Sequence, residues 1–371
     1  MNELALERVT DLKQVVNVAI ISPCQGRYGG LEGFVLAIAK GVRTDQDVNL
    51  NLCFKQTDGF ELGRDLETRV ADSGAKVTFV RKASMDLVRA IWQADVVHVQ
   101  NPCPDVVFMA RAMGKPLLIN VINYSRGGKS LHERLWRLCL GLGHRRFYIS
   151  EFVRRTWEKS EQPWRNSRVV FPICDLSALE PLPPEQRKGF IFVGRWIENK
   201  GIDTLVEAYG RAGLDPQEWP LQLLGDGPLR QRVEALVSKL GLRGVQMPGF
   251  VDETEKGERI RRSKFAVIPP NTREDFGLVA VEARHLGVPC IVTRDGGLPE
   301  AAGRHSLICE PGDVEGLAAL LKRASAMDAQ EYASLARTTH ESLPEELVAP
   351  SFYTKIYSEL ARGSRASVAR G

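Results

Sequence analysis

The chain has 371 residues, of which 43% are hydrophobic and 26% charged, and its formal net charge is +4. This length is too great for one ordinary core and suits two α/β domains of a globular protein. The small positive charge permits an anionic ligand or an anionic membrane surface. Without a basic aromatic run, it argues against a nucleic-acid partner.

The N-terminus and the cysteines favour a cytoplasmic protein. Residues 1–14 are polar and charged, unlike a signal peptide, and no apolar run reaches the length that spans a bilayer. None of the seven cysteines belongs to a Cys-x-x-Cys pair, and most lie in apolar surroundings. We therefore expect them to be reduced and structural.

The first predicted elements are a strand, a glycine-rich turn and a helix. The apolar run 15–22 predicts a buried strand, and Gly29 and Gly30 lie in the turn before a helix that reaches Ala39. Such a turn brings backbone amides to a phosphate or a sugar. The glycine spacing differs from the dinucleotide-binding fingerprint, so a tight turn without a ligand is an equal alternative.

Further strands alternate with helices through the first half of the chain. The predicted strands are 48–54, 76–80, 95–100, 116–122 and 146–150. Nearly continuous apolar strands predict a parallel sheet covered on both faces, and ligands bind beyond the carboxyl ends of such strands. This rule points to His98, Asn123 and Arg126 as candidate site residues. For His98, a satisfied core histidine is an equal alternative.

A proline-rich segment, 171–188, predicts a linker between two α/β domains. We expect an N-terminal domain at 1–173 and a C-terminal domain at 174–349. The C-terminal helix 350–363 would pack back on the first domain, and 364–371 would be a disordered tail. The strands predicted in the second half are 189–193, 221–224, 245–251, 265–270 and 289–293. The loops after these strands would converge on one sheet edge and form a cleft facing the first domain.

The stretch from Glu274 to Glu282 organises the second half. It follows a buried strand and leads into a helix, so Glu274 precedes the helix and Gly277 lies in its first turn. Glu282 follows roughly 12 Å further along the helix axis. Amides at a helix N-terminus favour a phosphate, and a glycine without a Cβ lets a ligand approach. Two carboxylates on either side of a phosphate site suit a nucleotide sugar.

Five motifs follow one another at the ends of the predicted strands. They are the Gly29-Gly30-x-Glu32 turn, Gly194-Arg195 with Lys200-Gly201, Gly225-Asp226-Gly227-Pro228, the 274–282 stretch, and Gly296-Gly297-Leu298-Pro299-Glu300. With these motifs the chain resembles the retaining glycosyltransferases of family 4 (glycosyl transferases group 1). The resemblance covers nearly the whole chain and is strongest from Phe190 to Pro311. It implies the α/β GT-B fold, in which two Rossmann-like domains with parallel sheets face each other across a cleft.

The resemblance also implies roles for single residues. Arg195 and Lys200 would clamp the donor diphosphate and stabilise the leaving group, and Glu274 would hold hydroxyls of the donor sugar. Glu282 would bind the ribose hydroxyls. The other donor-binding residues would be Gly29, Gly30 and Gly194 near the diphosphate, Phe250 and Val251 at the base, and Phe276, Gly277 and Leu278 through their amides.

The implied reaction moves a sugar from a nucleotide-diphosphate sugar to a hydroxyl of a glycan or glycolipid, with retention, as in cell-surface polysaccharide or lipopolysaccharide biosynthesis. Because Arg195 and Lys200 take the place of a cation, we expect no metal and no cofactor. The sequence departs from the family after the strand 116–122, where Ile122 or Asn123 stands in place of a histidine. A nucleotide-sugar epimerase of the same fold and a non-catalytic nucleotide-sugar-binding protein are the alternatives.

The acceptor would lie in the first domain, where the stretch 129–147 mixes Leu and Trp with Arg134, Arg137, Arg145 and Arg146. A basic amphipathic helix of this kind can rest on an anionic membrane, here the inner face of the cell membrane. The favoured alternative is a helix that packs on the core and carries a charged outer face.

Overall fold

The computed structural model describes residues 15–43, 45–128, 130–172, 179–349 and 351–368. The chain divides into two compact units. Unit 1 comprises Met1–Asn120, Lys129–Phe147 and Ala349–Gly371, and unit 2 comprises Val121–Gly128 and Tyr148–Val348. The boundary predicted between residues 173 and 174 falls in the segment 173–178, which lies outside the described residues.

The first sheet has seven strands in the order β3-β2-β1-β4-β5-β6-β7. The strands are β1 (Val16–Cys24), β2 (Val48–Gln56), β3 (Lys76–Val80), β4 (Val96–Gln100), β5 (Leu117–Val121), β6 (Arg145–Tyr148) and β7 (Ser167–Val169). Strand β1 pairs in parallel with β2 and β4. In this register Ile20 stands opposite Leu52 and His98, and all three side chains are fully buried.

The helices of the first half form two groups. They are α1 (Gly30–Val42), α2 (Arg64–Ser73), α3 (Met85–Gln93), α4 (Pro104–Ala112), α5 (Leu131–Leu142) and α6 (Glu151–Glu158). Helix α1 contacts α2, whereas α3 contacts α4 and α4 contacts α5. Right-handed crossovers explain this, because the chain runs one way from β1 to β3 and the other way from β4 to β6, which puts the two groups on opposite faces.

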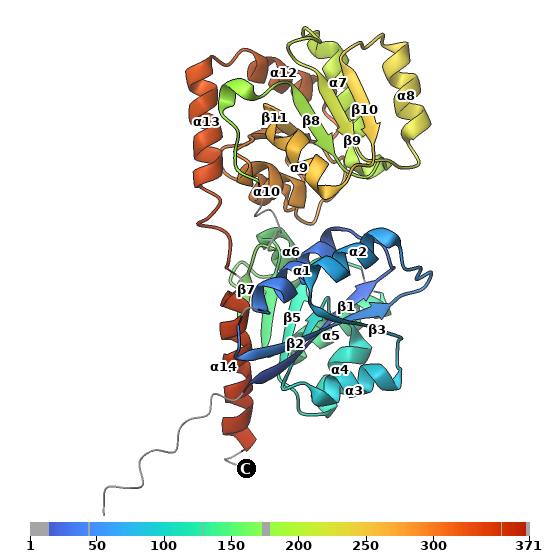
Figure 1. Ribbon diagram of the computed structural model, residues 1–371, viewed down its shortest axis with the longest axis vertical. Helices are drawn as coiled ribbons and strands as arrows, with labels where there is room; N and C mark the ends of the chain where they lie inside the picture. The colour runs from blue at the N-terminus through green and yellow to red at the C-terminus, as the bar shows by residue number, and fades with distance from the viewer. Residues whose placement is uncertain (1–14, 44, 129, 173–178, 350, 369–371) are drawn as a thin grey trace, which may run out of the picture. The chain divides into compact units, whose positions relative to one another are not determined.

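The C-terminal helix α14 (Ser351–Val368) contacts α1, β1 and β4 and runs beside the sheet of unit 1 (Figure 1). The prediction of a disordered tail from residue 364 is wrong for 364–368, since the helix continues to Val368. No proline follows Gly363, and a glycine in open space costs a helix only about 1 kcal/mol. Residues 350 and 369–371 lie outside the described residues.

The second sheet belongs to unit 2 and has six strands in the order β10-β9-β8-β11-β12-β13. The strands are β8 (Phe190–Val193), β9 (Leu221–Leu224), β10 (Val245–Gly249), β11 (Phe265–Ile268), β12 (Cys290–Thr293) and β13 (Leu307–Cys309). All five neighbouring pairs are parallel. The short strands β7 and β13 were not predicted, because three residues carry too little apolar pattern.

The helices of unit 2 connect these strands and cover the sheet (Figure 1). They are the 3-10 helices η1 (Pro184–Gln186) and η2 (Glu198–Lys200), and α7 (Ile202–Ala212), α8 (Arg230–Lys239), α9 (Glu253–Arg261), α10 (Leu278–His285), α11 (Leu298–Ala302), α12 (Val314–Ser325) and α13 (Ala329–Glu341). Buried aromatic side chains, among them Phe190, Trp196 and Phe265, fill the core between sheet and helices.

Both sheets have the doubly wound order, in which the strand sequence reverses between β1 and β4 and between β8 and β11. Ligands of open α/β sheets bind at such reversal points, beyond the carboxyl ends of the strands. In unit 2, the loops after β8 and β11 are therefore the places to look for a site. Within the described part of the chain, no helix combines the length and the apolarity needed to cross a bilayer.

Candidate active site

The loops after β8 and β11 bring a predicted cation and a predicted carboxylate together. Lys200, the last residue of η2, places Nζ 2.6 Å from Oε2 of Glu274. Both side chains remain partly accessible, at 25% and 17% of their surface. Arg195, in the same loop as Lys200, is exposed. The sequence-predicted catalytic residues thus lie at the strand reversal point of unit 2.

These two loops interlock through a glycine. Gly201 adopts a φ of +66°, and a Cβ there would collide with the carbonyl oxygen of Pro269. The backbone N of Asn271 donates to the carbonyl of Asn199 over 3.0 Å. The position of Lys200 is therefore fixed by its neighbours in both loops.

The Gly225-Asp226-Gly227-Pro228 motif supports the loop that carries Arg195. Gly225 has a φ of +111°, and a Cβ there would collide with the carbonyl of Gly194. The backbone N of Trp196 donates to the carbonyl of Asp226 over 2.9 Å, and the Trp196 side chain is fully buried. A buried residue directly after Arg195 anchors the loop and leaves the guanidinium outside.

The loop after β12 supports Glu274 in the same way. Asp295 accepts a hydrogen bond from the backbone N of Glu274 (2.6 Å), and the backbone N of Gly297 donates to the Glu274 carbonyl (2.9 Å). Gly296 has a φ of +55°, and a Cβ there would collide with that carbonyl. Burial raises the pKa of Asp295. The Gly296-Gly297 motif is needed for this close approach between two backbones.

Helix α10 begins at Leu278, and Gly277 is its N-cap rather than a residue of the first turn. Gly277 has a φ of +99°, and a Cβ would overlap the side chain of Leu298. Protein packing and backbone conformation therefore explain this glycine without a ligand. The Phe276 side chain is buried and meets the ring of Phe171 edge-on at 4.8 Å. Only the amides of this segment remain as candidates for phosphate binding.

Glu282 is held by a lysine that the sequence analysis missed. Lys256 of α9 places Nζ 3.0 Å from Oε1 of Glu282 and 2.6 Å from Oε2 of Glu253. Burial lowers the pKa of Lys256, but the two carboxylates outweigh burial, and the net pKa lies above its usual value. The other oxygen of Glu282, Oε2, is buried and has no hydrogen-bond partner among the residues that the structure describes. Its acceptor capacity is unused.

Asp275 is a second residue that the sequence analysis did not select. Its Oδ1 accepts a hydrogen bond from the backbone N of Tyr124 (2.7 Å), and its Oδ2 accepts one from Nδ2 of Asn123 (3.4 Å). Burial, together with the negative charge of Glu274, raises the pKa of Asp275 to about 6, although the hydrogen bonds from Tyr124 and Asn123 and the charge of Lys200 lower it. Its place inside the 274–282 motif was the one signal available.

The Asn123–Tyr124 segment therefore joins the candidate site, since it belongs to unit 2 like Glu274. Trp157 Nε1 donates to the Asn123 carbonyl (2.7 Å), and the Ser125 amide donates to Thr156 Oγ1 (2.9 Å). The Asn123 and Arg126 side chains are exposed. The structure links Asn123 to the motif carboxylates but shows no such link for Arg126 among the described residues.

Strand β4 places His98 in the core of unit 1. The ring is fully buried, Nδ1 lies 2.8 Å from Tyr357 Oη, and Nε2 lies 3.2 Å from Gln100 Nε2. Burial lowers the pKa of His98 to about 3, so the ring is neutral. The core-histidine alternative therefore describes this residue, and the sugar-binding assignment is corrected.

The remaining predicted residues lie in two turns. Gly29 is the N-cap of α1 in extended backbone that any residue can adopt, and Gly30 is the first residue of that helix. Phe250, directly after β10, is 77% exposed, and Val251 is half-buried. An exposed aromatic ring at a strand end is available for a flat ligand group such as a base.

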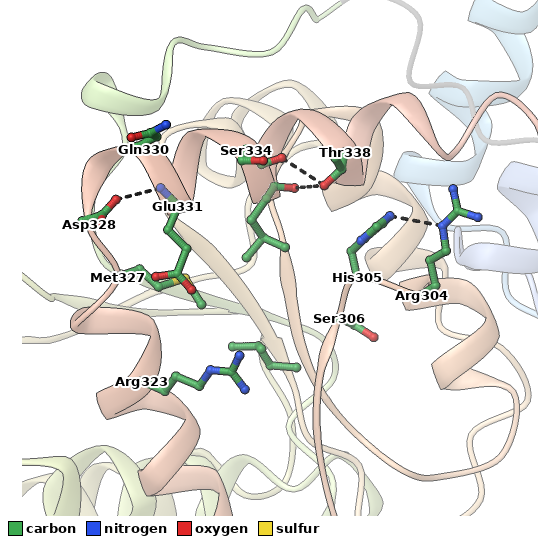
Figure 2. A pocket seen from close by; sticks show the side chains of 12 residues that line it. Arg304, His305, Ser306, Arg323, Met327, Asp328, Gln330, Glu331, Ser334 and Thr338 are labelled. Atoms are coloured by element: carbon green, nitrogen blue, oxygen red, sulfur yellow. Dashed lines mark hydrogen bonds between the residues drawn. The ribbon is translucent and has the colours of Figure 1, made fainter.

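A surface pocket of about 780 Å³ lies elsewhere in unit 2 (Figure 2). Residues of α12, α13 and the turn before β13 line it, among them Arg304, Arg323 and Glu331. None of the predicted site residues contributes to it. No cluster of His, Cys, Asp and Glu able to hold a metal ion occurs in the described part of the chain.

Comparison with solved structures identifies the fold. Over 93% of its length the chain matches Anabaena HepE in complex with UDP, with a TM-score of 0.77 and 16% identity, covering 100% of that chain. A glycosyltransferase from Rickettsia africae matches over 93% of this chain and 98% of its own, with a TM-score of 0.74 and 16% identity. The fold is therefore GT-B, as predicted.

The family follows from the sequence match. Residues 179–340 match the family Glycosyl transferases group 1, so unit 2 carries a domain of this family. An uncharacterised glycosyltransferase of Methanocaldococcus jannaschii is 33% identical over 130 residues, 34% of this chain and 35% of the relative. Glycogen synthase of Mycobacterium tuberculosis is 31% identical over 182 residues, 47% and 43%. The chain thus matches less than half the length of these relatives.

Proposed function

We propose that the chain is a retaining glycosyltransferase that moves a sugar from a nucleotide-diphosphate sugar to a hydroxyl of a glycan or glycolipid. The observation that carries this proposal is the pair of Lys200 and Glu274, 2.6 Å apart at the strand reversal point. The pair lies in the loops that lead to η2 and to the N-terminus of α10, and Glu282 follows on the same helix. A sugar diphosphate needs a cation and helix amides to bind its phosphates, and carboxylates to accept hydrogen bonds from its hydroxyls.

In this proposal the site acts by positioning and by charge. The diphosphate lies against Lys200, Arg195 and the first amides of α10, which stabilise the negative charge as the bond to the sugar breaks. Once the phosphate engages Lys200, the carboxylate of Glu274 is released to accept hydroxyls of the donor sugar. Because the side chains of Lys200 and Arg195 supply the positive charge, the reaction requires no metal.

Retention is proposed through the leaving group. A diphosphate oxygen that takes the acceptor proton acts on the face from which it departs, so the acceptor oxygen attaches on that face. The anomeric configuration of the product, read by proton NMR before any mutarotation, tests this point. An inverted product would contradict it.

The acceptor is proposed from the relatives. A lipopolysaccharide core biosynthesis glycosyltransferase of Rhizobium meliloti is 32% identical over 155 residues, 41% of this chain and 43% of the relative. We therefore place the acceptor among cell-surface glycans and glycolipids, which are extended at the cytoplasmic face of the cell membrane.

One assay tests the function. The protein is incubated with UDP-, GDP- and ADP-sugars, and nucleotide release is measured with and without acceptor extracts. Acceptor-dependent release by the wild type that Lys200→Ala removes would support transfer. Conversion of the donor sugar without transfer would identify an epimerase, and binding without turnover would identify a binding protein.

Helix α5 supports a peripheral membrane contact. The core side of this helix carries Glu133, Cys139 and Leu140, whereas Leu131 and Leu138 are 73% and 54% exposed. The core side thus packs as the favoured alternative expects, but the outer face carries exposed leucines as well as charge. Residue 129, the first of the predicted stretch, lies outside the described residues.

Exposed leucines flanked by a basic side chain suit an anionic bilayer. Arg134, between the two leucines, is exposed. We expect the protein to sediment with anionic liposomes at low salt and Leu131→Glu/Leu138→Glu to reduce this binding. Equal sedimentation of wild type and variant would place the membrane contact elsewhere, and no sedimentation of the wild type would exclude it.

A further inference from the structure

Asp275 joins separate segments of unit 2 beside the proposed donor site. Its carboxylate accepts hydrogen bonds from the Tyr124 amide (2.7 Å) and the Asn123 carboxamide (3.4 Å). Its own carbonyl accepts a hydrogen bond from Ser150 Oγ over 2.9 Å. One residue, directly after Glu274, thus holds both the Asn123–Tyr124 segment and the residue before α6.

The backbone of the Asn123–Tyr124 segment is also fixed from helix α6. Trp157 donates to the Asn123 carbonyl, and Trp157 is itself 2% exposed. The Asn123 side chain, in contrast, is exposed. The contact of Asp275 with the Tyr124 amide therefore adds to the hold on the backbone, and its contact with Nδ2 of Asn123 acts on the orientation of the exposed side chain.

We propose that Asp275 is a positioning residue for sugar transfer, which holds the Asn123 carboxamide beside the Lys200–Glu274 pair so that it contacts the donor sugar. This inference rests on the proposed function. A carboxylate only accepts hydrogen bonds, so the NH₂ group of Asn123 turns towards Asp275 and the carboxamide oxygen turns away. That oxygen then accepts a hydrogen bond from a hydroxyl of the sugar.

The charges around Asp275 agree with a functional constraint. Glu274 repels the carboxylate of Asp275, and Lys200 attracts it. Burial beside another carboxylate raises the pKa of Asp275 to about 6. Half-buried carboxylates with a raised pKa beside a second carboxylate cluster at functional sites.

The test is a double-mutant cycle on the donor that the wild type consumes in the assay above. Asp275→Asn keeps the size of the side chain but introduces an NH₂ group that repels the NH₂ group of Asn123. The Asn123 carboxamide then rotates, so that its oxygen faces residue 275 and no longer faces the donor sugar. A misplaced contact in a transition state costs about 10²-fold, so we expect that loss in kcat with a nearly unchanged KM for the donor. Because Asp275 acts through Asn123, the double variant with Asn123→Ala should be no slower than Asn123→Ala alone.

Glu300→Gln is the matched control. Glu300 is also a half-buried carboxylate of unit 2 that accepts backbone amides, but its described partners are the amides of Glu151 and Phe152 of α6, at 2.6 and 2.8 Å. We expect its kcat to equal that of the wild type. Losses that multiply in the double variant, or an equal loss in Glu300→Gln, would overturn the proposal.

The outcomes separate the inference from the function on which it rests. A wild type that consumes no nucleotide sugar contradicts the proposed function. An active wild type with unchanged kcat in Asp275→Asn contradicts the inference alone. If Asp275→Asn fails to fold, Asn123→Ala decides, since it alters an exposed side chain, and wild-type kcat in that variant overturns the proposal.

Discussion

The substitution Asp275→Asn should stabilise the protein at neutral pH while it slows transfer. Burial raises the pKa of this carboxyl from 3.8 to about 6 in the folded chain. Between these two values the folded state holds a proton that the unfolded state has lost, so stability falls as the pH rises through that window. The difference of roughly 2.2 pKa units corresponds to about 3 kcal/mol at the higher pH. Asparagine has no ionisable group and removes this cost.

The assay is urea unfolding of the wild type and of Asp275→Asn, followed by tryptophan fluorescence at several pH values. The buried Trp196 and Trp157 both report on unit 2. The free energy of unfolding of the variant, minus that of the wild type, should rise from near zero at about pH 4 to about 3 kcal/mol at about pH 8. A difference that stays flat with pH, or that falls as the pH rises, would refute the reasoning.

Three further predictions concern the neighbouring residues. Lys200→Ala removes the charge at the leaving group and should lower kcat about 10²- to 10³-fold, as measured by nucleotide release; a change confined to KM would contradict this role. Lys256→Met removes the hydrogen bond to Oε1 of Glu282, so that neither carboxylate oxygen keeps a partner among the described residues, and should raise the Kd for the nucleotide in calorimetry with kcat nearly unchanged; an unaltered Kd would show that Lys256 does not orient Glu282. Gly296→Ala should cost stability and kcat, because its Cβ collides with Glu274, whereas Gly312→Ala, with a φ of +74° and open space around it, should cost about 1–2 kcal/mol and no kcat; equal effects in thermal unfolding and kinetics would contradict the collision.

The sequence was sufficient for the architecture because its signals are local. The apolar runs that end in glycine-bearing loops became β8, β9 and β11, and their alternation with helices predicted parallel sheets. The predicted carboxylate of Glu274 and the predicted cation of Lys200 lie in contact because loops at a strand reversal point converge.

The sequence alone could not show why glycine is required at the motif positions. Gly277 was interpreted as a place for a ligand to approach, but the structure shows a φ of +99° and the Leu298 side chain in the way of a Cβ. Gly225 and Gly296 act by letting one loop approach the carbonyl of another. Such contacts join residues far apart in the chain, and no local pattern encodes them.

The partners of the carboxylates were missed for the same reason. Lys256 stands on a charged helix, where most lysines are solvated, and its contact with Glu282 spans 26 residues. The contact of Asp275 with Tyr124 spans 151 residues. His98 was predicted as a site residue but lies in the core. The sequence around its strand does not show that Tyr353 and Tyr357 of the C-terminal helix cover it.

The most direct test of the account is calorimetric titration of the wild type, Lys200→Ala and Glu282→Gln with UDP, GDP and ADP and with the corresponding nucleosides. We predict that the wild type binds at least one of these nucleotides and that both variants bind it more weakly, Lys200→Ala through the diphosphate and Glu282→Gln through the ribose. Lys200→Ala should also lose its preference for the diphosphate over the nucleoside, whereas Glu282→Gln should keep it. A wild type that binds none of the three, or variants with unchanged affinity, would contradict the site at the strand reversal point of unit 2.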